Sequence, residues 1–286
     1  MLVIVPTPLG NKGDITLRGQ EVLTKANIIY AEDTRVCAKL LSLYDIHTPI
    51  ARLDQVVIEQ RKDEVINTAR TKLVAYCTDA GMPGVSDPGM ALVAAARKAH
   101  VNVDVLPGAS ASVLAYVSSG FSCPHFYFHG FVPRKQSQQA SLFASLDALD
   151  ACLIFYDSPY RIAKTLECAA SVWPDRRCAL CRELTKLHQE VLVDALPALS
   201  QNIAHRCKTN PLKGEVVFVV DGPSKNAPNQ HAVAGAQKNK EDACVAAYDM
   251  AQQGAHVRDI TRMLKDDFAL SRNDAYDMAL TALRSI

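Results

Sequence analysis

One stretch of this chain limits its possible folds more than any other, the segment from Lys72 to Gly89. It begins with an apolar run of the length and composition of a buried strand, and a helical pattern resumes at Met90. The 12 residues from Thr78 to Gly89 contain three Gly, two Pro and two Asp. Connections are usually only about 4–6 residues long, so this one is either an unusually long ordinary loop or a binding loop. A strand, an irregular loop and a helix in succession are typical of ligand sites in open α/β sheets.

Apolar runs and amphipathic stretches alternate through the first 120 residues. Strands are expected at residues 2–5, 28–30, 50–52, 72–77 and 101–106, with helices between them. This order predicts a parallel, doubly wound sheet. We therefore expect residues 1–120 to form an N-terminal α/β domain.

The pattern changes after residue 120. His125–His129 alternates as an antiparallel strand would, and further strands are expected at 152–156, 177–181, 188–193 and 213–220. Helices are expected between these strands as well. We therefore expect a second α/β domain at residues 121–223, with some antiparallel pairing and a ligand cleft between the two domains.

The C-terminal part differs again. Residues 224–240 contain Ser, Asn, Gln, Lys, Pro and Ala without periodic apolar residues, which predicts a linker. Residues 241–286 predict a small unit of three helices, with Ser271 as the expected N-cap of the third. Such a unit could imitate a helix-turn-helix. Its Arg and Lys residues are matched by Asp, however, which favours a helical appendage used for packing or partner binding.

Composition narrows the possible classes of protein. Lys and Arg total 31 against 30 Asp and Glu, a net charge of +1, so nucleic-acid binding would need a local basic patch. Residues 1–6 lack the features of a signal peptide, and no apolar run approaches the roughly 18 residues of a membrane span. The nine Cys are scattered, and Cys178 and Cys181 form a lone CxxC in a strand-like run. We expect a soluble, cytoplasmic protein without membrane anchor or metal.

Several familiar signatures are missing. The chain has no GxxxxGK[ST], no GxGxxG after the first strand, no GxSxG and no HExxH, which argues against the nucleotide, hydrolase and protease sites they mark. Irregular loops at strand ends remain, at residues 6–11, 79–89, 107–111 and 156–159. Several loops that converge on one crevice suit a bulky, nucleoside-like ligand held largely by backbone groups.

Eight short motifs occur in order within about residues 1–222. They are Val5–Asn11, Asp14–Thr16, Ala31–Arg35, Thr78–Pro83, Leu106–Gly108, Phe155–Tyr156, Arg182–Lys186 and Lys213–Glu215. Together they closely resemble the ribosomal RNA small subunit methyltransferase I family. That family belongs to the tetrapyrrole-methylase-like superfamily, with diphthine synthase and the precorrin methyltransferases. The helical tail resembles the family's C-terminal extension more loosely.

The resemblance implies S-adenosylmethionine (SAM) bound in the cleft between two α/β domains of a homodimer, and 2′-O-methylation of a cytidine in small-subunit (16S) ribosomal RNA. The residues it places against SAM are Leu9, Asp79, Gly81, Met82, Ser110, Ala111, Tyr156, Leu184 and Glu215. Asp79 is the expected partner of a polar end of the ligand, and Leu184 and Glu215 are expected to frame adenine through their backbones. Taken singly, Leu9, Met82 and Leu184 could equally be packing residues.

Methylation of a ribose hydroxyl needs alignment of the acceptor oxygen with the methyl group. The hydroxyl is a weak nucleophile, so it gains from a base or from a charge that stabilises the developing alkoxide. Asp33 and Glu183 are the candidate proton acceptors. Arg35, Arg182 and Lys186 are candidates for holding phosphate or stabilising the oxygen. The alternative is that these groups form structural ion pairs beside the cleft.

The chain departs from the family pattern in two places. The stretch Leu53–Glu59 keeps Asp54 but lacks the His that the family usually has there. After Pro133 the family is usually rich in Lys and Arg, whereas here Arg134 and Lys135 are followed by Gln and Ser. Fewer charges predict weaker or more salt-sensitive RNA binding. Two alternatives therefore stay open: SAM-dependent methylation of a small molecule or protein on the same fold, and a non-catalytic SAM-binding module.

Overall fold

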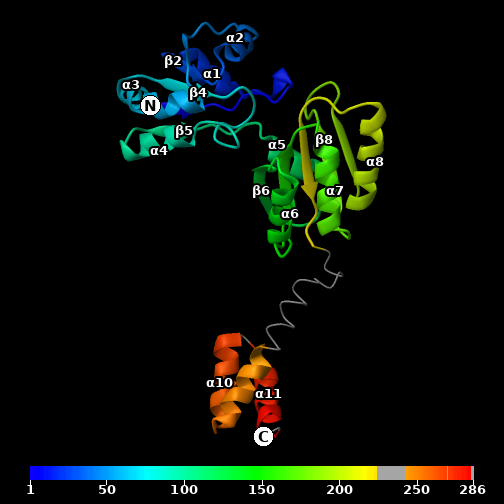
Figure 1. Ribbon diagram of the computed structural model, residues 1–286. Coiled ribbons are helices and arrows are strands. Elements are labelled where there is room, and N and C mark those ends of the chain that lie inside the picture. Colours follow the sequence, from blue (N-terminus) through cyan, green and yellow to red (C-terminus); the bar gives the residue numbers. More distant parts are fainter. Residues whose placement is uncertain (224–241, 269, 285–286) are drawn as a thin grey trace. The chain divides into compact units, whose positions relative to one another are not determined.

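The computed structural model describes residues 1–223, 242–268 and 270–284 (Figure 1). The chain divides into two compact units, Met1–Gly222 and Pro223–Ile286. The larger unit contains two five-stranded sheets, and the smaller unit is helical. The expected linker at 224–240 lies outside the described residues.

The first sheet is entirely parallel. Its strands are β1 (Leu2–Ile4), β2 (Ile28–Ala31), β3 (Ile50–Arg52), β4 (Val74–Cys77) and β5 (Val103–Val105), in the spatial order β3-β2-β4-β1-β5. Strand β4 is fully buried along its length, as expected for a parallel strand covered on both faces. The expected doubly wound sheet is thus confirmed.

Helices cover both faces of the first sheet (Figure 1). The helices α1 (Leu17–Lys25) and α2 (Thr34–Ser42) share a core with one face, which includes Val3 and Ile29. The helices α3 (Gln55–Thr71) and α4 (Met90–Lys98) pack on the other face. A short 3₁₀ helix, η1 (Lys12–Asp14), precedes α1.

The strand order creates a topological switch point between β1 and β4. The chain leaves β1 toward the β2 side of the sheet, whereas it leaves β4 toward β5 at the opposite edge. The helices that follow these two neighbouring strands, α1 and α4, pack on opposite faces of the sheet. Open α/β sheets bind ligands in the crevice at such a point, outside the carboxyl ends of the strands. The long loop after β4 is one of the two connections that form this crevice.

The second sheet is mixed. Its strands are β6 (Phe126–Phe131), β7 (Cys152–Asp157), β8 (Arg177–Arg182), β9 (Glu190–Ala195) and β10 (Val216–Val220), in the order β6-β7-β10-β8-β9. Strand β10 pairs antiparallel with β7 and β8, and β8 pairs antiparallel with β9. Strand β6 pairs parallel with β7, so the antiparallel reading of His125–His129 is wrong. β6 is an edge strand of this sheet, and the burial of its side chains does not alternate along it.

One helix crosses from the first sheet to the second. The helix α5 (Ala111–Ser119) follows β5 in the chain, but it packs on β7, β8 and β10 (Figure 1). The helices α6 (Gln136–Ser145), α7 (Ile162–Val172) and α8 (Leu196–Thr209) cover the opposite face. The core on that side contains Phe143, Phe155, Trp173 and Phe218, all buried.

The two cysteines of the CxxC lie in β8, and both are free and buried. Cys178 packs into the core beneath α7 and α8, whereas Cys181 packs into the core beneath α5. The two thiols therefore lie on opposite faces of the sheet, as the alternation of a strand requires. Burial raises the pKa of the Cys181 thiol to about 12.

Within its described residues, the smaller unit has three helices, at residues 242–252, α10 (Val257–Phe268) and α11 (Arg272–Arg284). Its core combines Ile260 and Leu264 with small side chains such as Ala247 and Ala279, so the helices can approach closely. Ser271 caps α11, because its Oγ accepts the Asp274 N–H at 3.2 Å.

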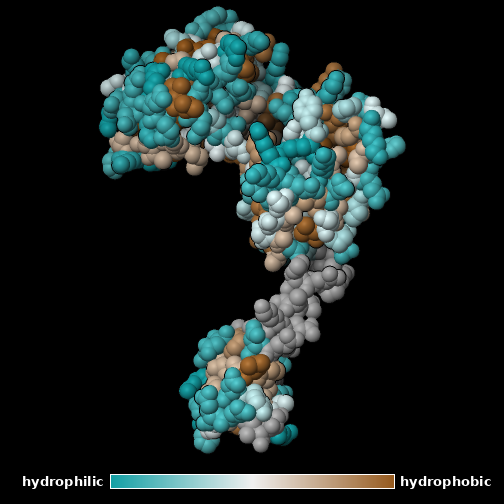
Figure 2. Space-filling model, in the orientation of Figure 1, coloured by the Kyte–Doolittle hydropathy of each residue, from teal (hydrophilic) through white to brown (hydrophobic). Residues whose placement is uncertain are grey.

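The surface in Figure 2 is largely hydrophilic, with apolar residues scattered over it. None of the helices in the described ranges is long and apolar enough to cross a bilayer.

Candidate functional site

A cavity of about 360 Å³ opens at the switch point and is lined from both sheets of the larger unit. The size suits a small organic ligand. Its lining residues are Leu9, Glu32, Asp79, Ala80, Gly81, Met82, Val85, Ser86, Asp87, Ser110, Ala111, Phe131, Tyr156, Asp157, Pro159, Gly214, Glu215, Val216 and Val217.

The loops after β1 and β4 are hydrogen-bonded to each other at the base of the cavity. Thr7 and Gly81 form an isolated antiparallel bridge, with N–H to carbonyl distances of 3.0 and 2.9 Å. Gly81 has a φ of +81°, and a Cβ on it would lie 3.1 Å from the Leu9 side chain. Only glycine adopts this conformation without strain. The bridge therefore fixes the positions of Leu9 and Met82 at the cavity wall.

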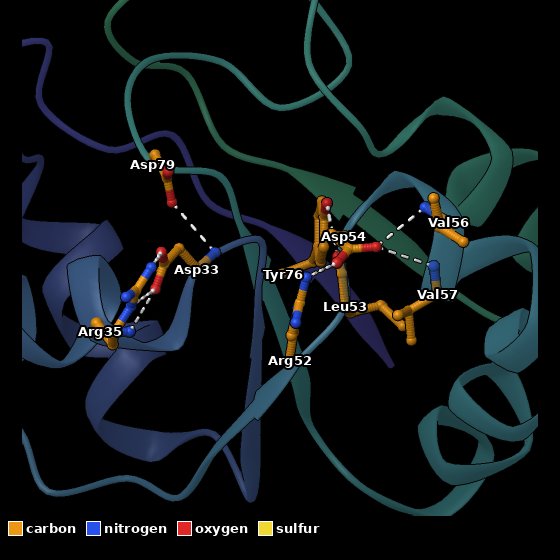
Figure 3. A network of polar contacts seen from close by, with 9 residues as sticks. All are labelled: Asp33, Arg35, Arg52, Leu53, Asp54, Val56, Val57, Tyr76 and Asp79. Atoms are coloured by element: carbon orange, nitrogen blue, oxygen red, sulfur yellow. Dashed lines mark hydrogen bonds and ion pairs between the residues drawn. The ribbon is translucent and has the colours of Figure 1, made fainter.

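Two carboxylates beside the cavity serve as N-caps of helices (Figure 3). The Asp33 carboxylate caps α2 by accepting the Arg35 N–H at 2.8 Å, and the Arg35 guanidinium donates to it as well. These bonds hold the pKa of Asp33 far below its usual range. Asp33 in turn donates its backbone N–H to the Asp79 carboxylate at 3.2 Å. Asp54 caps α3 in the same way, so the Asp that the family pattern keeps has a structural role here.

Three carboxylates of the cavity lining, those of Glu32, Asp79 and Asp87, are close enough to repel one another. Burial raises the pKa values of Glu32, Asp79 and Asp87. For Asp87 the value is about 6, through burial first and then the negative charges of Glu32, Asp79 and Glu215. No hydrogen bond or ion pair reaches the Asp87 carboxylate from the part of the chain that the structure describes. The cavity therefore carries excess negative charge and favours a cationic ligand.

The loop after β8 lies next to the cavity and is hydrogen-bonded to Glu215 of its lining. Glu183 and Thr185 have φ values of +50° and +67°, a conformation that is strained for these residues. The Lys186 Nζ lies 3.0 Å from both Glu183 Oε1 and Glu215 Oε2, and Glu183 Oε1 also accepts the Glu215 N–H at 2.9 Å. Burial raises the pKa of Glu183, but the hydrogen bonds from Glu215 and Lys186 outweigh it, so the net pKa is lowered.

The loop after β8 also contacts the connection that follows β1. The Asn11 N–H donates to Thr185 Oγ1 at 3.2 Å, and Gly10 lies so close to Lys186 that a Cβ would meet its side chain. The strained turn is therefore held from two sides.

Tyr156 forms the inner wall on the side of the second sheet. Its ring packs edge-on against Phe128 at 4.8 Å and against Phe131 at 5.5 Å between centroids. Burial raises the pKa of its hydroxyl. Ser110 and Ala111 line the cavity at the start of α5.

The structure brings most of the expected cofactor residues together. Eight of the nine line the cavity, namely Leu9, Asp79, Gly81, Met82, Ser110, Ala111, Tyr156 and Glu215. Leu184 is instead buried in the core beneath α5. The four expected catalytic residues, Asp33, Arg35, Glu183 and Lys186, lie next to lining residues but not in the lining itself.

Among the lining residues to which sequence reasoning gave no role are Glu32, Asp87 and Phe131. Glu32 and Asp87 lie within a motif or loop that the sequence singles out. What distinguishes them is their position in the cavity, which depends on contacts between distant segments.

Comparison with known proteins identifies the family. Residues 1–200 match the model of the Tetrapyrrole (Corrin/Porphyrin) Methylases. The chain is 36% identical over 285 residues to the ribosomal RNA small subunit methyltransferase I of Micromonospora olivasterospora, covering 98% of this chain and 87% of that protein. It is 38% identical over 222 residues to the protein of the same name from Thermotoga maritima, covering 77% of this chain and 98% of that one.

Among solved structures, a diphthine synthase aligns with a TM-score of 0.61 and 18% identity, over 77% of this chain and 89% of that one. This likeness supports the fold. On the strength of the sequence matches, the chain belongs to the ribosomal RNA small subunit methyltransferase I family of tetrapyrrole methylases.

Proposed function

We propose that this chain is a SAM-dependent methyltransferase that methylates the 2′-hydroxyl of a cytidine in small-subunit (16S) ribosomal RNA. The observation that carries the proposal is the cavity at the switch point, in a chain whose relatives are named ribosomal RNA small subunit methyltransferase I. A homodimer is part of the proposal, because the family resemblance implies one.

The residues of the cavity fit SAM in charge. The sulfonium and the amino group of SAM are cationic, and the carboxylates of Glu32, Asp79 and Asp87 offer them compensation. Asp157 also lines the cavity, but its side chain is fully buried and pairs with Arg161, so its carboxylate is not exposed to a ligand. When bound, SAM supplies an electrophilic methyl group.

The remaining task for the protein is to accept the proton of the ribose hydroxyl. Asp33 and Glu183 are candidates, but both accept several hydrogen bonds and both have lowered pKa values. Asp87 lines the cavity, has a pKa of about 6 and accepts no hydrogen bond from the described residues. A base is most effective when its pKa lies near the working pH, which favours Asp87. Arg35, with its exposed guanidinium, and Lys186 are proposed to hold phosphate or stabilise the developing oxyanion.

The test is transfer of labelled methyl from SAM to small ribosomal subunits purified from cells that lack this protein. Label that maps to one cytidine ribose supports the proposal. Binding of SAM without transfer to the subunits contradicts it and favours another acceptor or a non-catalytic role.

The proton acceptor is tested in the same assay with Asp87→Asn, Asp33→Asn and Glu183→Gln. Loss of a general base typically lowers kcat about 10²- to 10⁴-fold. The largest loss is expected for Asp87→Asn, with SAM kept saturating so that weaker binding does not contribute. A full rate for Asp87→Asn would exclude it as the acceptor.

A further inference from the structure

An exposed aromatic ring stands at the mouth of the cavity. Phe131 is the last residue of β6, lines the cavity and is 60% exposed. Its ring meets the Tyr156 ring edge-on, with 5.5 Å between centroids and an angle of 72°. One edge of Phe131 is thus supported by the protein, while more than half of its surface stays open to a ligand.

The backbone aims this ring outward through a β-bulge. The register of β6 against β7 shifts between Phe128 and Gly130. Gly130 has a φ of +90°, and a Cβ on it would lie 3.1 Å from the Ser86 Oγ of the loop after β4. Bulges next to active sites re-aim side chains in this way. Without the bulge, alternation along the strand would turn Phe131 to the other face of the sheet.

Hydrogen bonds then hold the chain after the ring in place. The Val132 N–H donates to the Tyr156 carbonyl at 3.0 Å. The Arg161 guanidinium donates to the Val132 carbonyl at 2.6 Å and to the Pro133 carbonyl at 3.2 Å, and Gln139 Nε2 donates to the latter at 2.9 Å. A ring presented on so fixed a backbone loses little entropy when a ligand covers it.

We propose that Phe131 is the stacking surface for the base of the target nucleotide; this inference rests on the proposed function. A ribose can enter the cavity only if its nucleotide leaves the RNA stack. Proteins compensate the lost stacking with aromatic side chains, which accept the face of an unstacked base. Arg134 and Lys135 follow Phe131 closely in the chain and are exposed, so they can contact the phosphates that flank the target nucleotide.

The experiment compares Phe131→Ala, Phe131→Leu and Phe131→Trp in methyl transfer to small ribosomal subunits, with SAM affinity measured by calorimetry on the same samples. Leucine keeps the apolar character but has no π-face, whereas tryptophan keeps the face. Tyr127→Ala is the control, because Tyr127 is an exposed aromatic residue of the same strand outside the cavity.

For Phe131→Ala and Phe131→Leu we expect a loss of about 5- to 150-fold in kcat/KM for the subunits, the range for one base–aromatic stack. The loss should fall mainly on KM. Phe131→Trp should retain more activity than Phe131→Leu, Tyr127→Ala should stay near the wild type, and any loss of SAM affinity should be much smaller than the loss in kcat/KM.

Three results would overturn the inference. Full activity of Phe131→Leu would show that apolar contact suffices. An equal loss of SAM affinity would assign the ring to the cofactor, and a change of oligomeric state in solution would assign it to a contact between copies. If the wild type itself transfers no methyl to the subunits, the proposed function fails and this inference with it. A working wild type with an active Phe131→Leu contradicts the inference alone.

Discussion

Replacing Asp87 by Asn should stabilise the ligand-free protein while impairing its function. The pKa of Asp87 rises from an ordinary 3.8 to about 6, because the carboxylate is partly buried and faces other negative charges. A difference of about two pH units corresponds to ~3 kcal/mol without screening. Asp87 is only half-buried, so screening by solvent reduces this to about 1.5 kcal/mol. Asparagine has nearly the same shape and no charge, so the variant should recover that free energy.

The sign of the pH dependence follows from proton linkage. The folded state binds the Asp87 proton more tightly than the unfolded state, so the ionised carboxylate destabilises the fold as pH rises. The advantage of Asp87→Asn should therefore be complete above about pH 6, shrink as the pH falls, and vanish below 3.8.

The assay is thermal unfolding of SAM-free protein between pH 4 and pH 8. For a unit of this size, about 1.5 kcal/mol corresponds to a rise of roughly 3–6 °C in Tm. Asp63→Asn is the control, because Asp63 is an exposed carboxylate on α3. An Asp87→Asn variant that is no more stable than the wild type at pH 8, or whose advantage persists at pH 4, would contradict a raised pKa of Asp87 in the folded protein.

Three further perturbations test other parts of the structure. Gly81→Ala should lower the free energy of unfolding by about 1 kcal/mol or more and weaken SAM binding, because Gly81 has a φ of +81° and lies against Leu9. Gly254 has the same φ but nothing within 4 Å of its added Cβ. Gly254→Ala should therefore show the backbone cost without any loss of SAM affinity by calorimetry. Lys186→Met should lower the free energy of unfolding in urea by about 1–2 kcal/mol, since it leaves Glu183 and Glu215 unpaired; an unchanged midpoint would contradict the network. Phe155→Ala should cost about 3–5 kcal/mol in the same assay, because its buried ring contacts Phe143, Trp173 and Phe218; a cost below about 1 kcal/mol would mean that the core closes around the gap.

The alternation and length of apolar runs were enough to predict the parallel sheet. Segments such as Val74–Cys77 are apolar on both faces, which is typical of a parallel strand covered on both sides. The direction of β6 could not be predicted in the same way. The alternation of residue types in this segment carries no information about strand direction, and β6 pairs parallel with β7 while its burial does not alternate.

The charge environment of the site is harder to predict than its motifs. Asp87 and Asp79 belong to one loop, but Glu32 comes from the end of β2 and Glu215 from the start of β10. The raised pKa of Asp87 depends on all of them at once. The aim of Phe131 depends on a bulge of one residue, and local composition does not place such a bulge.

The position of α5 has a consequence for how the larger unit can be divided. This helix follows the first sheet in the chain but supplies one of the two covers of the second. A fragment ending near residue 120 would therefore carry an apolar helix with no partner, and the fragment beginning there would expose one face of its sheet. Neither half is a self-sufficient folding module, so the two sheets should melt in a single cooperative transition. The helical tail is a separate unit and could be exchanged between relatives, whereas the two sheets would have to be inherited together.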